Sequence, residues 1–145
     1  MGHYAGLYGS GIFIENQPGK LAEATRYIAG HGINLRAMSI ADTKDFGILR
    51  VICDDPEQSA EVLREGGYIT NVTEVLAVGN NDAPGSLATI LEIIAKAGVS
   101  VEYTYAFLGT RMAGAFMIFR VDDNAKASAA LEAAGIKTVE QSDMF

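Results

Sequence analysis

The chain of 145 residues contains one segment twice, and this repeat limits the fold more than any other feature. Residues 16–22 read NQPGKLA and residues 82–88 read DAPGSLA, at an offset of 66 positions (84 − 18 = 66). Identities at this offset continue downstream and include Ile28/Ile94 and Gly32/Gly98. The aspartate pair at 54–55 returns at 122–123, an offset of 68. A repeat of this length divides the chain into two similar units.

Composition narrows the classes of protein and partner. Each unit of about 70 residues is near the lower limit for a single hydrophobic core. The net charge of −7 without a basic cluster makes a nucleic-acid partner improbable. A single cysteine, Cys53, allows no internal disulfide and fits a cytoplasmic protein. No apolar segment approaches the ~20 residues that cross a bilayer, so we expect no membrane partner.

Periodicity predicts the same order of elements in both units. Residues 1–11 contain four glycines and no hydrophobic block, and we expect a flexible N-terminal lead-in there. The spacing of apolar residues then predicts strand, helix, strand, strand, helix, strand. In the first unit these elements are residues 12–14, 18–29, 33–41, 46–53, 54–65 and 68–73. In the second unit they are residues 74–78, 84–97, 99–108, 115–121, 124–134 and 136–140.

The expected fold class is α+β. Two tandem ferredoxin-like βαββαβ units, over residues 12–72 and 73–145, would each have an antiparallel sheet with helices on one face. No linker rich in Pro, Gly or Ser separates them, because the last strand of the first unit runs almost directly into the first strand of the second. We therefore expect the two units to lie side by side.

The pattern Asn/Asp-x-Pro-Gly-x-Leu before the first helix of each unit predicts a ligand-binding loop. First-turn N–H groups of a helix have no intrahelical acceptor and lie at its weakly positive end, which suits a carboxylate. Asn16 and Asp82 precede these turns, where a side-chain oxygen accepts from an ammonium group. Asn34 and Ser100, at the start of the following strand, are the next polar groups expected to face the same place. Together these groups are what a free α-amino acid requires.

The same residue types are also ordinary cap and turn residues. One isolated copy would favour this structural interpretation, since short motifs are weak hypotheses. Two copies at matching places in two similar units favour the ligand-binding one.

On these residues the chain resembles the tandem ACT-domain proteins, a family of small-molecule sensors that mostly bind amino acids. The resemblance covers residues 12–142 and is carried by residues 15–21 with 32–35, and by residues 80–87 with 98–101. In such domains the ligand usually lies at an interface between ACT units. It is held there by the loop before the first helix and by a polar residue at the start of the second strand.

The resemblance implies a set of ligand-binding residues in each unit. In the first unit they are Asn16, Pro18, Gly19, Lys20 and Asn34, and in the second Asn80, Asp82, Gly85 and Ser100. The units differ where Ser100 replaces Asn34 and where Asn80 replaces Ile14. We therefore expect the two sites to bind ligands unequally.

An aromatic stripe predicts a further contact surface. Val101, Tyr103, Tyr105 and Phe107 alternate and should share one sheet face, where they would serve packing or line a pocket. Packing is the commoner role of such a stripe. With the exposed sheet edges, it leads us to expect a homodimer.

These features predict a non-catalytic, amino-acid-sensing regulatory protein whose ligand acts allosterically on a partner enzyme or gene regulator. The alternative is a regulatory subunit that docks on an enzyme of amino-acid metabolism, with its ligand site vestigial. Catalysis is the third interpretation, but the chain offers only scattered carboxylates. It contains no phosphate loop, nucleophile elbow or metal-ligand spacing, so we expect no catalytic residues, cofactor or metal.

Overall fold

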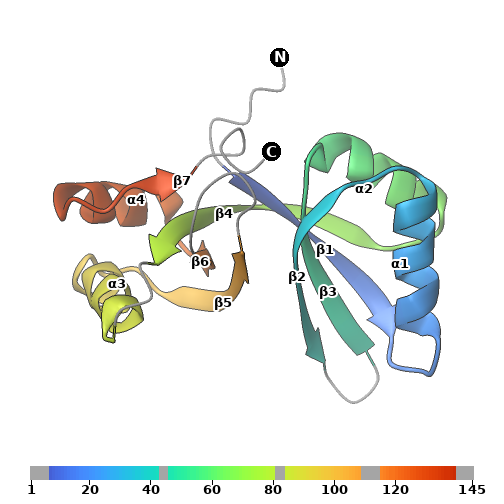
Figure 1. The fold of residues 1–145 in the computed structure, drawn as a ribbon, viewed down its shortest axis with the longest axis horizontal. Coiled ribbons are helices and arrows are strands. Elements are labelled where there is room, and N and C mark those ends of the chain that lie inside the picture. Colours follow the sequence, from blue (N-terminus) through green and yellow to red (C-terminus); the bar gives the residue numbers. More distant parts are fainter. Residues whose placement is uncertain (1–6, 43–45, 81–83, 109–114, 140–145) are drawn as a thin grey trace. The chain divides into compact units, whose positions relative to one another are not determined.

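The computed structural model describes residues 7–42, 46–80, 84–108 and 115–139 (Figure 1). The chain divides into two compact units, which we call the N-terminal unit (Tyr8–Thr73) and the C-terminal unit (Glu74–Phe145 together with Met1–Leu7). Each unit has the order strand, helix, strand, strand, helix, strand. Neighbouring strands pair antiparallel. The expected tandem ferredoxin-like α+β fold is therefore confirmed.

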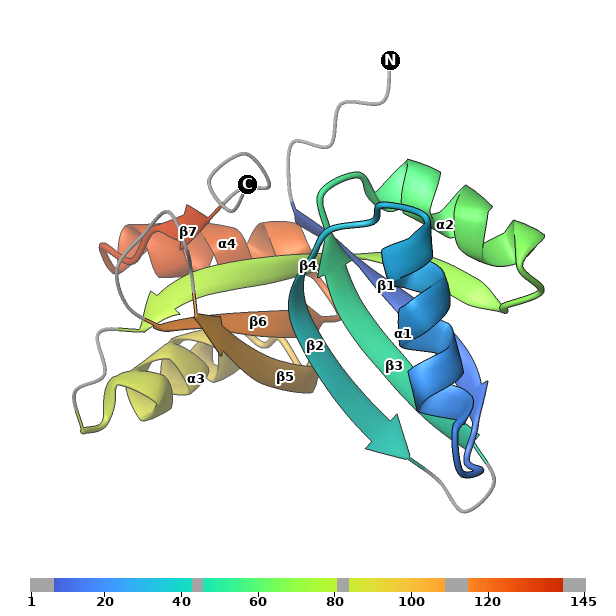
Figure 2. The same ribbon diagram turned by 45° about the vertical axis from the view of Figure 1, so that its right-hand side comes forward.

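In the N-terminal unit, two helices cover one face of a sheet with the strand order β2-β3-β1-β4 (Figure 2). Its elements are β1 (Leu7–Glu15), α1 (Lys20–Gly30), β2 (Leu35–Asp42), β3 (Phe46–Cys53), α2 (Pro56–Glu65) and the first part of β4 (Thr70–Asn80). Ala24 and Ile28 of α1 and Leu63 of α2 pack on Ile12 and Leu49 of the sheet. Because these strand residues alternate along each strand, they share the sheet face that the two helices cover.

The C-terminal unit repeats this arrangement with the second part of β4 as its first strand. Its other elements are α3 (Ser86–Lys96), β5 (Val101–Leu108), β6 (Ala115–Val121), α4 (Asn124–Ala133) and β7 (Thr138–Val139). β4 pairs with β6 and also with β7, and β5 pairs with β6. Ile90 and Ile94 of α3 and Leu131 of α4 meet Val78 and Phe119 of the sheet in the core.

The four helices among the described residues all end in the same way, which explains the glycines of the repeat. A glycine with positive φ follows each helix, and the next residue donates its N–H to a carbonyl five positions back. This is the Schellman arrangement, in which glycine is favoured because it has no Cβ. The residue after each glycine is apolar or aromatic and packs toward the core, so the cap also fixes the return of the chain to the sheet. The four glycines are Gly32, Gly67, Gly98 and Gly135.

The bounds of β1 and β4 differ from the expected ones. Residues 7–11 do not belong to a flexible lead-in, because they form the start of β1, and Leu7 and Ser10 are buried. Strand pairing, such as that of Ser10 with Val51, outweighs the low strand propensity of a glycine-rich segment. The strands expected at 68–73 and 74–78 are one continuous strand, β4, which spans the boundary between the units.

The aromatic stripe on β5 is interrupted by a β-bulge. The register of β5 against β6 shifts between Val101 and Tyr103, so Val101 turns to the helix-covered face and packs against the core. Tyr103 and Tyr105 stay together on the opposite face, with ring centroids 6.3 Å apart. The expectation that Val101 shares their face is wrong, because a bulge adds one residue to the alternation.

Helices α2 and α4 depend on aspartate caps, which provide a matched pair of tests. Oδ1 of Asp55 accepts from the Gln58 N–H, and Oδ1 of Asp123 accepts from the Lys126 N–H, both at 3.0 Å. We predict that Asp55→Ala and Asp123→Ala each lower the free energy of unfolding by about 1 kcal/mol, measured by urea denaturation. Asn keeps the acceptor, so Asp55→Asn should stay near the parent value. Alanine variants as stable as the parent would contradict this role.

Cys53 lies in the core of the N-terminal unit, and burial raises the pKa of its thiol to about 11. The reactive thiolate is therefore scarce at neutral pH. We predict that iodoacetamide labels the folded protein far more slowly at about pH 8 than the urea-unfolded protein. Because the folded-state pKa is the higher one, the stability contributed by the protonated thiol is complete below the ordinary thiol pKa of 9.0 and is lost as the pH rises through about 11. Equal labelling rates with and without urea would contradict this burial.

Candidate functional site

The loop between β1 and α1 is a tight turn that ends on a left-handed glycine. The Lys20 N–H donates to the Gln17 carbonyl at 3.2 Å, and Gly19 has φ 86° and ψ −13°. With Pro18 in second place and Gly19 in third, these values fit a type II turn. The helix consequently begins at Lys20, two residues later than expected. The expected start at Pro18 is wrong because the positive φ of Gly19 is incompatible with a helical residue.

The N-termini of α1 and α3 differ from those of α2 and α4. Gly19 and Gly85 are the N-cap residues of α1 and α3, and glycine has no side chain that could accept a hydrogen bond there. The earliest N–H of α1 with an acceptor in the helix is that of Glu23, which donates to Gly19. The geometry of a helix leaves the amides of Leu21 and Ala22 pointing out of its N-terminus. These two amides, and not that of Lys20, are the ones suited to a ligand carboxylate.

A small cavity of about 130 Å³ opens beside this loop. Asn16 and Gln17 of the loop line it together with Leu21 of α1 and Ile40 of β2. Lys20 pairs weakly with Glu23, at 3.8 Å on the exposed surface. The sequence motif located the loop and Leu21, whereas Ile40 was not singled out, because its spacing is that of an ordinary strand residue.

Asn34 lies at the other end of the sheet from Asn16. The Asn34 carbonyl accepts the Asp54 N–H at 3.3 Å, next to the pairing of Leu35 with Cys53. Asn16 follows Glu15, which pairs with Phe46 at the opposite end of β3. Seven residue steps along β3 correspond to about 23 Å. Within one unit, therefore, the two asparagines do not face the same place.

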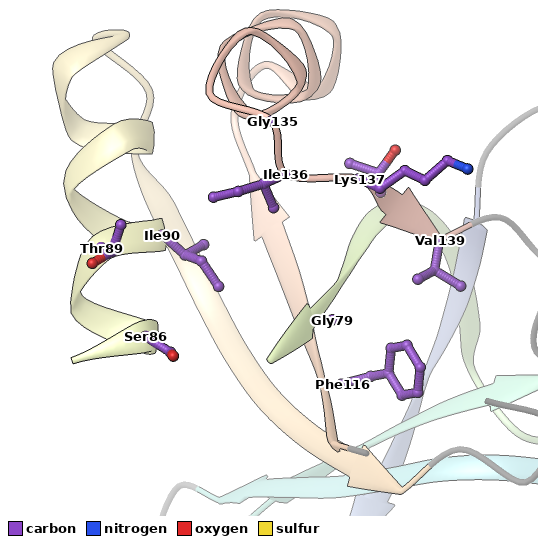
Figure 3. A pocket seen from close by; sticks show the side chains of 10 residues that line it. Gly79, Ser86, Thr89, Ile90, Phe116, Gly135, Ile136, Lys137 and Val139 are labelled. Carbon is purple, nitrogen blue, oxygen red and sulfur yellow. The ribbon is translucent and has the colours of Figure 1, made fainter. Parts of the chain in front are cut away.

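The second loop, between β4 and α3, shares the left-handed glycine of the first loop but differs in its polar residues and in the size of the cavity beside it. Gly85 has φ 86° and α3 begins at Ser86, as in the first loop. Ser100 lies at the far end of its sheet, where its N–H donates to Asp122 Oδ1 at 2.9 Å. Asp82 is outside the described residues, and Asn80 is placed by its backbone alone as the last residue of β4. Beside this loop lies a larger cavity of about 620 Å³ (Figure 3).

The described residues contain neither a candidate metal site nor a membrane-spanning helix. No group of three or more His, Cys, Asp and Glu side chains lies close enough to hold a metal ion in this part of the chain. None of the described helices has the length and apolar character needed to cross a membrane.

Comparisons with known proteins agree with this architecture. A solved protein from Bacteroides thetaiotaomicron, BT0572, is 32% identical over 97% of this chain and 96% of that chain, with a TM-score of 0.87. The ligand-free regulatory subunit of aspartate kinase from Thermus thermophilus is 18% identical over 90% of this chain and 92% of that chain, with a TM-score of 0.65. The Thermus flavus regulatory subunit gives 18% identity, 91% and 92% coverage, and a TM-score of 0.65. At 18% identity the likeness concerns the fold alone.

The comparison with curated proteins gives no match. The profile of one protein family, described as the ACT domain pair, matches residues 7–145. This match spans both units and both Pro-Gly loops. The chain therefore belongs to the ACT domain pair family.

Proposed function

We propose that this protein is a non-catalytic sensor that binds a free amino acid between ACT units of a homodimer, where the ligand acts allosterically. The observation that carries the proposal is the separation of Asn16 and Asn34, which lie at opposite ends of their sheet. One small ligand cannot contact both residues in the same unit. It can contact both only if Asn16 of one copy meets Asn34 of a second copy.

An antiparallel pairing of β2 with β2 of the second copy would create this meeting. In the described residues β2 pairs with β3 alone, so its other edge is available. Antiparallel pairing sets the start of one strand beside the end of the other. Asn34, which precedes β2, would then approach the end of the second copy's β2, where the loop of Asn16 lies. Two equivalent sites would result from the twofold symmetry.

The residues of β2 favour such a contact. Met38 and Ile40 are large apolar side chains that are 51% and 46% exposed. A register centred on Ser39 would set Met38 opposite Ile40 of the second copy, and the reverse, so that both become buried. A long apolar edge strand that stays unpaired is an aggregation hazard, which such a dimer would remove.

The chemistry of the proposed site follows from its parts. The carboxylate would accept from the amides of Leu21 and Ala22 at the uncapped N-terminus of α1. The ammonium group would donate to the side-chain oxygens of Asn16 and of Asn34 from the second copy. The cavity of about 130 Å³, with Leu21 and Ile40 in its wall, would favour a small amino acid. In the C-terminal unit the matching set is Asn80, Asp82, Gly85 and Ser100, and we propose that it binds more weakly or binds a different ligand.

Regulation would come from a difference between the ligand's affinities for two arrangements of the dimer. A ligand that contacts both copies stabilises the paired arrangement over any other, and a partner enzyme or gene regulator would read that difference. The aspartate kinase subunits of like fold carry "regulatory subunit" in their descriptions, which supports a regulatory role but identifies no partner. The single buried cysteine supports a cytoplasmic location.

A mixing experiment tests whether the site is shared between copies. Asn16→Ala and Asn34→Ala should each abolish or weaken amino-acid binding by about 1–3 kcal/mol in calorimetry. Mixing the two variants should restore binding, because a mixed dimer contains one site with both asparagines. After random exchange of subunits, about one quarter of the parent's sites should recover the parent affinity.

The double variant Asn16→Ala/Asn34→Ala, mixed with parent protein, is the matched control for subunit exchange. Its mixed dimers contain no site with both asparagines, because each site receives one alanine. If the two single variants fail to complement each other although exchange is shown by sedimentation of tagged chains, the shared site is refuted. If the parent binds no amino acid but captures a stoichiometric enzyme, the alternative of docking with a vestigial site takes its place.

A further inference from the structure

The cavity of about 620 Å³ in the C-terminal unit lies between α3, the end of β4 and the α4–β7 connection. Figure 3 shows Ile90 pointing from α3 toward the strands, with Ile136 above it and the ring of Phe116 on the opposite side. Gly79, at the base of the cavity, has no side chain to occupy it. Cavities of 300–1,000 Å³ are the usual size of small-molecule sites.

Comparison of the two repeats shows that two cavity-lining positions carry smaller side chains than their counterparts in the N-terminal unit. Phe13 of β1 corresponds to Gly79, at the offset of 66, and Tyr68 corresponds to Ile136, at the offset of 68. In the N-terminal unit the ring of Tyr68 packs against Tyr27, with centroids 5.4 Å apart. The C-terminal unit has smaller side chains at both positions. Both of these smaller residues line the cavity.

The cavity wall combines apolar side chains with few polar groups. Ile90, Phe116, Ile136 and Val139 provide the apolar part, and Ser86, Thr89 and Thr138 provide hydroxyls. Lys137 is the one charged side chain among the described lining residues. In Figure 3 its stem runs along the rim beside Val139, with the nitrogen directed outward. A flexible four-carbon stem lets the ammonium group turn to a ligand at the mouth.

We propose that this cavity is a second ligand site, for a small organic carboxylate with an apolar body and no ammonium group. The apolar body lies between Ile90, Ile136 and Phe116, and the carboxylate lies at the mouth beside Lys137. Lys137 is positively charged and the described wall contains no carboxylate, so the charge at the mouth favours a carboxylate over an ammonium group. This site is separate from the proposed amino-acid site of the N-terminal unit, which is built on Asn16 and Asn34.

The test uses 4-methylpentanoate as the probe, because it has the carbon skeleton of leucine without the ammonium group. Titration is followed by NMR of isoleucine methyl groups, which report on Ile90 and Ile136. We expect saturable shifts at these methyls, weaker binding of the neutral amide 4-methylpentanamide, and no response of the same methyls to leucine. Absence of shifts with the parent protein up to about 10 mM 4-methylpentanoate refutes the proposal.

Variants that introduce residues of the N-terminal unit locate the site. Gly79→Phe/Ile136→Tyr should fill the cavity and reduce affinity at least about tenfold. A Cβ at Gly79 meets only the Phe116 ring, at 3.9 Å, so the glycine itself is not required by the backbone. Thr89→Glu changes an exposed position to the residue found at Glu23 in the other repeat, and should repel the carboxylate. Lys137→Met should weaken the carboxylate about fivefold but leave the amide unchanged.

Asn16→Ala is the control that separates this site from the amino-acid site. It should leave 4-methylpentanoate binding at the parent affinity, whatever it does to amino acids. Parent affinity in both the cavity-filling variant and Thr89→Glu would overturn the proposal, even if one of these variants were less stable. Loss of 4-methylpentanoate binding in Asn16→Ala would also overturn it, because the probe would then occupy the other site.

Discussion

The candidate amino-acid site depends on one backbone constraint: the glycine before α1 and α3 is held in the left-handed region. Gly19 and Gly85 share φ 86°, a conformation that costs other residues roughly 1–2 kcal/mol. That conformation ends a type II turn and makes the glycine the N-cap. A glycine N-cap has no side chain to accept from the first turn, so the amides of Leu21 and Ala22 in α1 stay available to a ligand. Helices α2 and α4, whose caps are aspartates, satisfy theirs internally.

The repeat and the periodicity of the sequence were enough to predict the element order and the exact bounds of β3 and β6. These two strands are nearly continuous apolar runs, each broken by one arginine (Arg50 and Arg120), and a local pattern determines them. The start of α1 was mispredicted because a Pro-Gly pair fits both the first turn of a helix and the centre of a type II turn. The start of β1 was missed because pairing with β3, rather than composition, makes residues 7–11 a strand. The bulge at Val101 likewise depends on a partner strand.

Prediction of the candidate amino-acid site was limited in the same way, because it also depends on strand pairing. The motif located the loop of Asn16 and the strand start of Asn34, but strand direction and register decide how far apart they lie. Residue spacing in the sequence contains neither quantity. Only the pairing of β1, β2 and β3 reveals that the two asparagines belong to opposite ends of one sheet.

The two units show how one scaffold provides different cavities. Backbone turns, helix ends and sheet order are common to both, whereas the side chains at Phe13/Gly79 and Tyr68/Ile136 differ. Because glycine caps and sheet pairing hold the backbone, a change from a large to a small side chain opens space without moving the elements. The loss of packed aromatic surface has an energetic cost that a bound ligand would offset. Function in such a pair is therefore a property of each unit's own side chains, not of the fold.

The central claim is that a free amino acid binds through Asn16 and Asn34, and thermal unfolding against each of the twenty amino acids tests it most directly. A ligand at ~100 times its Kd adds about 2.7 kcal/mol, which raises the midpoint of a chain of this size by roughly 5–10 °C. The account predicts such a rise for one or a few small amino acids in the parent protein, and its loss in both Asn16→Ala and Asn34→Ala. No rise with any amino acid, or an equal rise in the two variants, would contradict it.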